Sequence, residues 1–146
     1  MRIVGDWLQS DDGIVRPVVV ATILGTDGQD HADRFLLDTG ADRTVLSAAF
    51  WRRLRLPADA PLPEMALTGI GGAAAIELVT TAIEFTRDDG GPARVRGQFA
   101  AFTDPQATDL SVLGRDVLDN FDVILSRRRD EVQLLAPPHR YVASRA

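Results

Sequence analysis

Short apolar runs separated by turn residues dominate the chain, and their spacing predicts strands rather than helices. Residues 14–24 are rich in β-branched side chains and predict a strand that returns over 34–37 after a glycine turn. Further strands are predicted over 76–85, 95–102, 110–113, 121–125 and 132–135. Only two short helices are expected, over 48–54 with Ser47 as cap and over 115–120. The pattern therefore predicts an all-β fold.

The length of the chain sets the number of domains. Its 146 residues, 45% of them hydrophobic, are enough for one core, and the chain contains no internal repeat. Residues 1–12 lack a regular pattern, so we expect an irregular N-terminal extension over 1–13. The folded domain should then span 14–136, and 137–146 should form a loosely held tail.

Charge and composition exclude several function classes. The net charge is -5, and all sixteen basic residues are arginine, which argues against a nucleic acid partner. The chain has no cysteine and hence no disulfide, which fits a reducing compartment. No apolar signal segment opens the chain, and the longest apolar stretch, near 18–24, is too short to cross a bilayer. We therefore expect a cytoplasmic protein with no membrane partner.

The candidate chemistry lies in the stretch 35–47. Three apolar residues run directly into Asp38, Thr39 and Gly40, and a second apolar pair follows at Val45 and Leu46. A lone Asp-Thr-Gly is also ordinary turn chemistry. Apolar runs on both sides favour a different interpretation, in which a buried strand ends by presenting one carboxylate on a tight loop.

The segment Leu-Leu-Asp-Thr-Gly-Ala-Asp-x-Thr-Val-Leu, over 36–46, resembles the active-site segment of retroviral-type aspartic proteases, the retropepsins. The resemblance implies that Asp38 is catalytic and that Thr39 hydrogen-bonds across a two-fold axis. It also implies that Gly40 lets the backbone approach the substrate, and that Ala41 and Asp42 contact it. A single-domain closed β fold with a glycine-rich flap hairpin is expected, with no metal or organic cofactor.

Peptide hydrolysis by carboxyl groups needs two of them, one ionised as general base and one protonated as general acid. This chain offers one Asp-Thr-Gly, so the second carboxyl must come from another copy related by a two-fold axis. We therefore expect a homodimeric endopeptidase in which an Asp38/Asp38 dyad activates a water against a peptide or protein substrate. The alternative is a non-catalytic peptide-binding module with the same fold.

The glycine-rich run over 69–72 admits more than one interpretation. Gly69, Gly71 and Ala74 match the dinucleotide-binding fingerprint, but that motif needs a long helix after it, and residues 76–81 favour a strand. The run resembles the retropepsin flap, which implies that residues 69–72 (Gly69, Ile70, Gly71 and Gly72) close over bound peptide. An ordinary glycine-rich turn remains an alternative.

A third segment, 111–118, resembles the family's apolar-apolar-Gly-Arg-x-x-Leu strand and helix. The resemblance implies an ion pair between Arg115 and Asp42. If that pair is partly buried, removing one partner should cost ~3–5 kcal/mol. The chain departs from the family pattern in the residues before its first strand and in the hairpin and tail after its last motif.

Other chemistries have little support in the sequence. His31 and His139 are the only histidines, so a zinc site is not expected, and no Gly-x-Ser-x-Gly presents a serine nucleophile. The three arginines at 127–129 read as a solvated turn. Trp7 and Trp51 read as packing residues.

Overall fold

The computed structural model describes residues 1–60, 67–69, 72–74, 76–104 and 110–144. Over these residues the chain forms mainly strands, with two short helices, α1 (Ala48–Leu54) and α2 (Arg115–Leu118). The strands are β1 (Arg2–Val4), β2 (Asp6–Gln9), β3 (Val15–Leu24), β4 (Asp30–Leu37), β5 (Val45–Leu46), β6 (Leu67–Gly69), β7 (Gly72–Ala74), β8 (Ile76–Thr86), β9 (Pro92–Phe102), β10 (Ser111–Leu113), β11 (Asp122–Ser126) and β12 (Glu131–Leu135).

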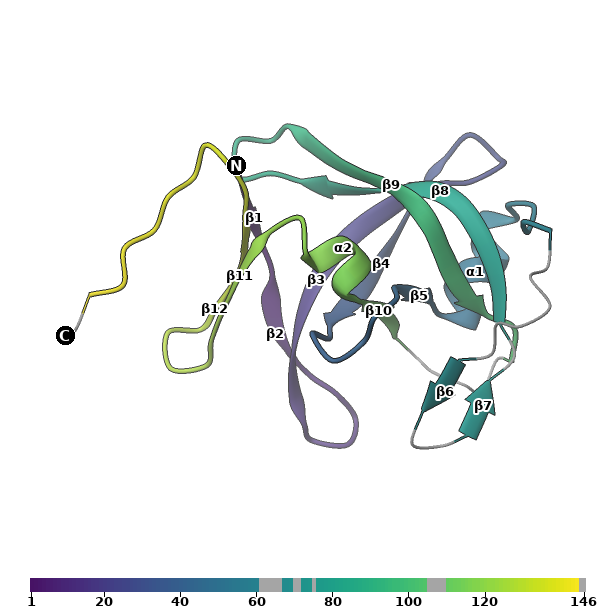
Figure 1. Ribbon diagram of the computed structural model, residues 1–146, viewed down its shortest axis with the longest axis horizontal. Helices are drawn as coiled ribbons and strands as arrows, with labels where there is room; N and C mark the ends of the chain where they lie inside the picture. Colours follow the sequence, from purple (N-terminus) through teal and green to yellow (C-terminus); the bar gives the residue numbers. More distant parts are fainter. Residues whose placement is uncertain (61–66, 70–71, 75, 105–109, 145–146) are drawn as a thin grey trace.

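The main sheet closes on itself as a barrel. Its order is β3-β4-β10-β5-β9-β8, and β8 returns to β3 through the pair Thr22 and Glu84, while β2 adds an outer strand to β3. Two long hairpins, β3–β4 and β8–β9, supply most of the wall, and in Figure 1 β8 and β9 arch over the barrel. The predicted all-β single-domain fold is confirmed.

The strand β10 threads between β4 and β5. It runs parallel to β4, with Val112 opposite Leu36, and antiparallel to β5, with the same Val112 opposite Val45. The residues between β4 and β5 are those of the Asp38 loop. The Asp38 loop therefore starts on one side of β10, at the end of β4, and ends on the other side, at the start of β5.

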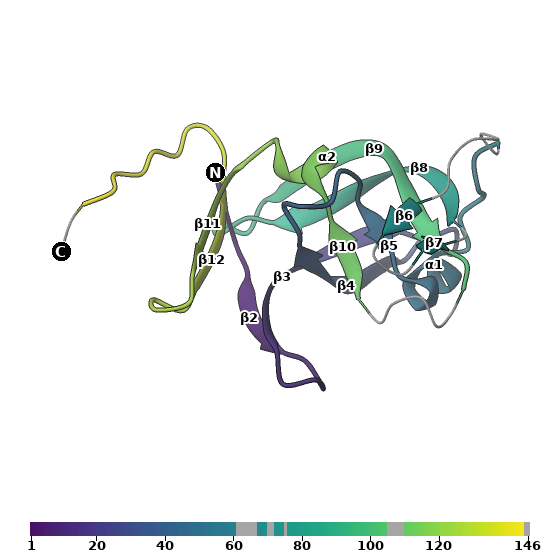
Figure 2. The ribbon, with the colours of Figure 1, turned by 60° about the horizontal axis from the view of Figure 1, so that its bottom comes forward.

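Strand β1, near the start of the chain, joins the late strands β11 and β12 in a separate three-stranded sheet, β1-β12-β11. Figure 2 shows this sheet beside the barrel, with β2 leading from one to the other. The turn between β1 and β2 is at Gly5, where a Cβ would lie 2.3 Å from the carbonyl oxygen of Val18, so only glycine fits there. The prediction that residues 1–12 are irregular is wrong, because β1 and β2 lie within them and pair with β12 and β3.

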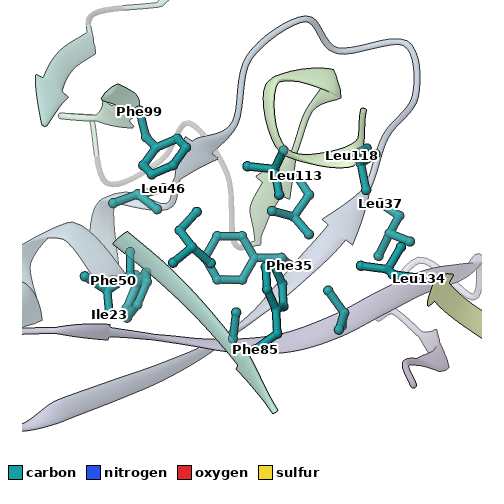
Figure 3. Packing of buried hydrophobic residues seen from close by; sticks show 14 of the residues in the cluster. Ile23, Phe35, Leu37, Leu46, Phe50, Phe85, Phe99, Leu113, Leu118 and Leu134 are labelled. Carbon is teal, nitrogen blue, oxygen red and sulfur yellow. The ribbon is translucent and has the colours of Figure 1, made fainter. Parts of the chain in front are cut away.

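The core fills the barrel and the space under α1. Its largest buried side chains come from β4, α1, β8 and β9, and the rings of Phe35 and Phe50 meet edge to face with centroids 5.9 Å apart. Figure 3 shows these side chains together with Leu113 of β10 and Leu118 of α2. Both helices and the strand β10 are therefore anchored in the same core as the hairpins.

The predicted helix at 48–54 is confirmed at both ends. Ser47 has an extended backbone and its Oγ accepts a hydrogen bond from the Phe50 N–H (3.2 Å), as an N-cap does. The helix ends at Leu54, followed by Arg55 in the left-handed conformation. The other predicted helix is shorter than expected and ends at Leu118. Neither described helix has the length and apolarity needed to cross a membrane.

Candidate active site

The Asp38 loop begins where β4 ends. The Asp38 N–H donates to the carbonyl oxygen of Leu113 on β10 (3.1 Å), which fixes the start of the loop against the neighbouring strand. Inside the loop, the Gly40 N–H donates to Oδ1 of Asp38 (2.9 Å) and the Ala41 N–H to its carbonyl oxygen (3.2 Å). The Asp38 side chain is half-buried, while Thr39 and Gly40 are exposed. The loop thus holds one carboxylate in a fixed orientation at the molecular surface.

The far side of the loop is fixed by Thr44, which is fully buried. Its N–H and hydroxyl both donate to the Asp116 carboxylate, with the hydroxyl 2.7 Å and the amide 2.9 Å from Oδ1. The same hydroxyl oxygen accepts a hydrogen bond from the Gly114 N–H (3.0 Å). Charge-assisted bonds of this kind are stronger than neutral ones. They join the loop to the start of α2.

Backbone contacts complete the junction with α2. The Arg115 N–H donates to the carbonyl oxygen of Ala41 (2.8 Å). A Cβ at Gly114 would lie 2.5 Å from the carbonyl carbon of Arg43, so the loop and the helix can approach this closely only because residue 114 is glycine.

The structure brings Asp42 and Arg115 together as an ion pair, with Nη2 of Arg115 donating to Oδ1 of Asp42. The Asp42 carboxylate raises the pKa of the Arg115 guanidinium. Both side chains are largely exposed, at 82% for Asp42 and 54% for Arg115. The cost of ~3–5 kcal/mol expected for a partly buried pair does not apply, because exposed pairs contribute ~1 kcal/mol or less.

A second polar cluster lies on the other side of β10. The buried Ser111 hydroxyl donates to Oδ2 of Asp33 (2.7 Å) and accepts a hydrogen bond from the Ser47 N–H (2.9 Å). Asp33 belongs to β4, Ser111 to β10, and Ser47 caps α1. The cluster therefore ties together the three elements that surround the loop.

A cavity of about 610 Å³ opens beside the loop, on the outer face of β2, β3, β4 and β10. Its apolar wall consists of Leu8, Leu36, Leu110 and Val112. The rim is charged: Asp12 and Arg16 form an ion pair (2.7 Å), and Arg34 lies beside them. Because Leu36 lies two residues before Asp38 and opposite Val112, the cavity begins next to the catalytic candidate.

The glycine-rich run forms part of a two-stranded hairpin, β6–β7, in which Gly69 pairs with Gly72. Ile70 and Gly71, which were predicted at its tip, lie outside the described residues. In Figure 1 the hairpin lies below the strands of the barrel. A hairpin agrees with the sequence expectation for this segment and leaves no room for the helix that a dinucleotide motif requires.

Sequence reasoning missed four residues that support the site: Thr44, Asp116, Ser111 and Asp33. Thr44 lies in the segment 35–47, Ser111 and Asp116 lie in the segment 111–118, and both segments were identified from the sequence. Asp33 lies outside both segments. No sequence signal indicated that Thr44 and Asp116 would be hydrogen-bonded, because they are 72 positions apart in the chain. Among the described residues, no group of three or more His, Asp or Glu side chains is placed to hold a metal ion.

Comparison with known proteins agrees with this geometry. A family model described as aspartyl protease matches residues 19–117, more than half of the chain. No curated protein sequence matches significantly. Many solved structures are similar, and two of them are proteases that cover most of this chain. EIAV protease complexed with the inhibitor HBY-793 is 26% identical, with a TM-score of 0.48 over 71% of this chain and 86% of that one.

The second structure is a retropepsin-like aspartic protease from Rickettsia conorii. It is 17% identical, with a TM-score of 0.55 over 92% of this chain and 90% of that one, so the likeness is one of fold. The family match covers the Asp38 loop, β10 and most of α2, which are the elements that build the site. The chain therefore belongs to the aspartyl protease family and has a retropepsin-like fold.

Proposed function

We propose that this protein is an aspartic endopeptidase that acts as a homodimer, with Asp38 of each copy forming the catalytic dyad. The observation that carries the proposal is a single carboxylate, Asp38, held on a loop that is tied on both sides. The neighbouring carboxylates have other partners: Asp42 is paired with Arg115 and Asp116 with Thr44. The second catalytic carboxyl must then come from another copy.

In the proposed reaction, the two Asp38 side chains share one proton. The ionised carboxylate takes a proton from a water as the water attacks the peptide carbonyl carbon. The protonated carboxyl gives its proton to the developing oxyanion, and the amine leaves after a second proton transfer. Two such groups at ~3 Å cannot both be charged, so they titrate as a unit. Thr39 and Gly40 are exposed, as contact with a partner loop would require.

The cavity beside the loop suggests how a peptide would bind. Its wall of Leu8, Leu36, Leu110 and Val112 suits an apolar side chain of the substrate. We further propose that the β6–β7 hairpin, with Gly69 and Gly72, acts as the flap, and that Ala41 and Asp42 contact the peptide backbone. Glycine permits the bending that such a lid requires.

The test is digestion of a diverse peptide library, with the products identified by mass spectrometry. We expect cleavage by the natural chain, none by Asp38→Asn, and unchanged cleavage by Asp119→Asn, an exposed carboxylate at the C-cap of the adjacent helix α2. Sedimentation should show a dimer in all three. Peptide that binds but is never cut would instead support the non-catalytic module.

Mixing the natural chain with Asp38→Asn tests the sharing of the site. If each site needs one Asp38 from each copy, excess Asp38→Asn chain should draw the natural chain into inactive mixed dimers. Activity should then fall in proportion to their fraction. Activity that stays constant as mixed dimers form would mean that one copy suffices.

A further inference from the structure

A depression of about 490 Å³ lies between the tip of the β3–β4 hairpin and the end of α1. The side chains that line it are all polar, and three of the six are arginines: Thr26, Asp27, His31, Arg52, Arg53 and Arg55. It differs in this from the cavity beside the Asp38 loop, which has an apolar wall.

The walls of the depression are fixed by hydrogen bonds. The Thr26 N–H donates to the carbonyl oxygen of Leu54 (3.1 Å), so the hairpin tip caps the C-terminal end of α1. In Figure 1 the two elements lie next to each other at one end of the barrel. Within the same hairpin, Nε2 of His31 lies 2.9 Å from the Asp27 carboxylate. These hydrogen bonds hold the hairpin tip and the end of α1 in fixed positions around the depression.

Its charge is unbalanced. Among the described residues of the lining, Asp27 is the one acidic side chain, and it is hydrogen-bonded to His31. The Arg53 side chain also has partners, since it donates a hydrogen bond to the carbonyl oxygen of Ala32 (3.1 Å) and lies over the Phe50 ring. Arg52 and Arg55 are exposed, and in the described part of the chain their side chains have no hydrogen bond or ion pair. Two free guanidinium groups thus face one opening, in a chain of net charge -5.

The backbone at Arg55 is unusual. Its φ of 53° and ψ of 26° place it in the left-handed region, at the helix end where glycine or asparagine is normally found. A non-glycine residue there carries a conformational cost. A residue without a Cβ would serve the helix better, yet the position carries an arginine that lines the depression. An outlier of this kind points to a role for the side chain.

We propose that this depression is a binding site for a phosphate group, free or carried by a small molecule. A planar guanidinium can donate two parallel hydrogen bonds to two oxygens of a phosphate, and the volume is in the range of small-molecule sites. The site is separate from Asp38. His31 stands near the start of β4 and Asp38 follows its end, so about 23 Å of extended strand lie between them.

The test is a titration of the labelled chain followed by ¹H–¹⁵N NMR, with inorganic phosphate or O-phosphoserine added at constant ionic strength. We expect saturable shifts of the amides of Thr26, His31, Arg52 and Arg55. Tighter binding of O-phosphoserine would identify a carried phosphate as the ligand, and tighter binding of inorganic phosphate the free ion. Equal shifts with sodium chloride alone would overturn the proposal.

Two variants separate binding from folding. Arg52→Ala and Arg55→Gly should each weaken phosphate binding about tenfold, the loss of one guanidinium contact. Arg55→Gly should at the same time raise the midpoint of thermal unfolding, because glycine removes the cost of the left-handed backbone. Arg128→Ala, an exposed arginine of the β11–β12 turn, is the control and should leave binding unchanged. Binding that is equal in all four proteins would refute the site. None of these measurements requires peptidase activity.

Discussion

The contact between Thr44 and Asp116 provides the sharpest test of how the loop is held. The change is Asp116→Ala, which removes the acceptor for both the N–H and the hydroxyl of Thr44. Thr44 is fully buried, so each donor loses its partner where water has little access. An unsatisfied buried donor costs ~1–3 kcal/mol. Because Asp116 itself lies at the surface, some water can enter, and we expect a loss of about 3 kcal/mol for the two donors.

The assay is urea unfolding at one fixed chain concentration, since dimerisation makes stability depend on concentration. A loss of 3 kcal/mol should also lower the thermal midpoint by about 10 °C for a chain of this size. The matched control is Asp119→Ala at the C-cap of the same helix, whose carboxylate accepts no hydrogen bond in the described part of the chain; it should change stability by ~0.5 kcal/mol or less.

A double-mutant cycle isolates the contact itself. Thr44→Val keeps the shape of the side chain and removes the hydroxyl, which leaves the Gly114 N–H without its acceptor. If the two residues interact as the distances indicate, the loss in the double variant should fall short of the sum of the single losses by ~1 kcal/mol or more. Additive losses, or an Asp116→Ala chain as stable as the natural one, would refute the reasoning.

Three other outcomes follow from the structure. Arg115→Ala should cost ~1 kcal/mol or less in urea unfolding, because its pair with Asp42 is exposed; a loss above ~3 kcal/mol would contradict this. Gly114→Ala should destabilise the chain by several kcal/mol (~3) in the same assay, since its Cβ meets the Arg43 backbone at 2.5 Å, and unchanged stability would show that the junction can relax. The pKa of Asp12 is lowered to about 2, mainly by its hydrogen bonds from Arg16, so an NMR titration should find it ionised at pH 3, and Arg16→Gln should raise its midpoint. Its contribution to stability is then complete above pH 4 and is lost as the pH falls from about 4 to about 2, which is the direction for a depressed carboxyl.

The sequence predicted those elements whose caps, turns and buried residues lie close together in the chain. The helix α1 was predicted at its observed bounds because its cap, Ser47, and its buried residues lie within one short segment. The hairpins β3–β4 and β8–β9 were recognisable because their turns contain Gly28 and Gly90, both with positive φ. Each of these elements is determined by residues that lie within one continuous segment of the chain.

The strand β1 was missed because its partner, β12, is distant in the sequence, and β2 was missed although its partner, β3, follows it directly. Residue Ile3 pairs with Leu134, and the first ten residues contain no apolar alternation long enough to predict a strand without that partner. The same limit applies to the site. The Asp-Thr-Gly motif identified Asp38, but the acceptor that holds Thr44 comes from α2, and no periodic pattern links positions so far apart. What the sequence could not supply was the list of long-range partners.

The order in which the strands pair in the barrel has a consequence for the order in which the protein folds. The hairpins β3–β4 and β8–β9 join residues that are near in sequence, so they can form early. The barrel seam rests on one pair, Thr22 with Glu84, and the loop that carries Asp38 is complete only when β10 and α2 have arrived. A chain still emerging from the ribosome therefore has no fixed Asp38 loop until residue 116 is available. We expect nascent fragments that end before residue 116 to be inert, because the acceptor that holds Thr44 is still missing from them.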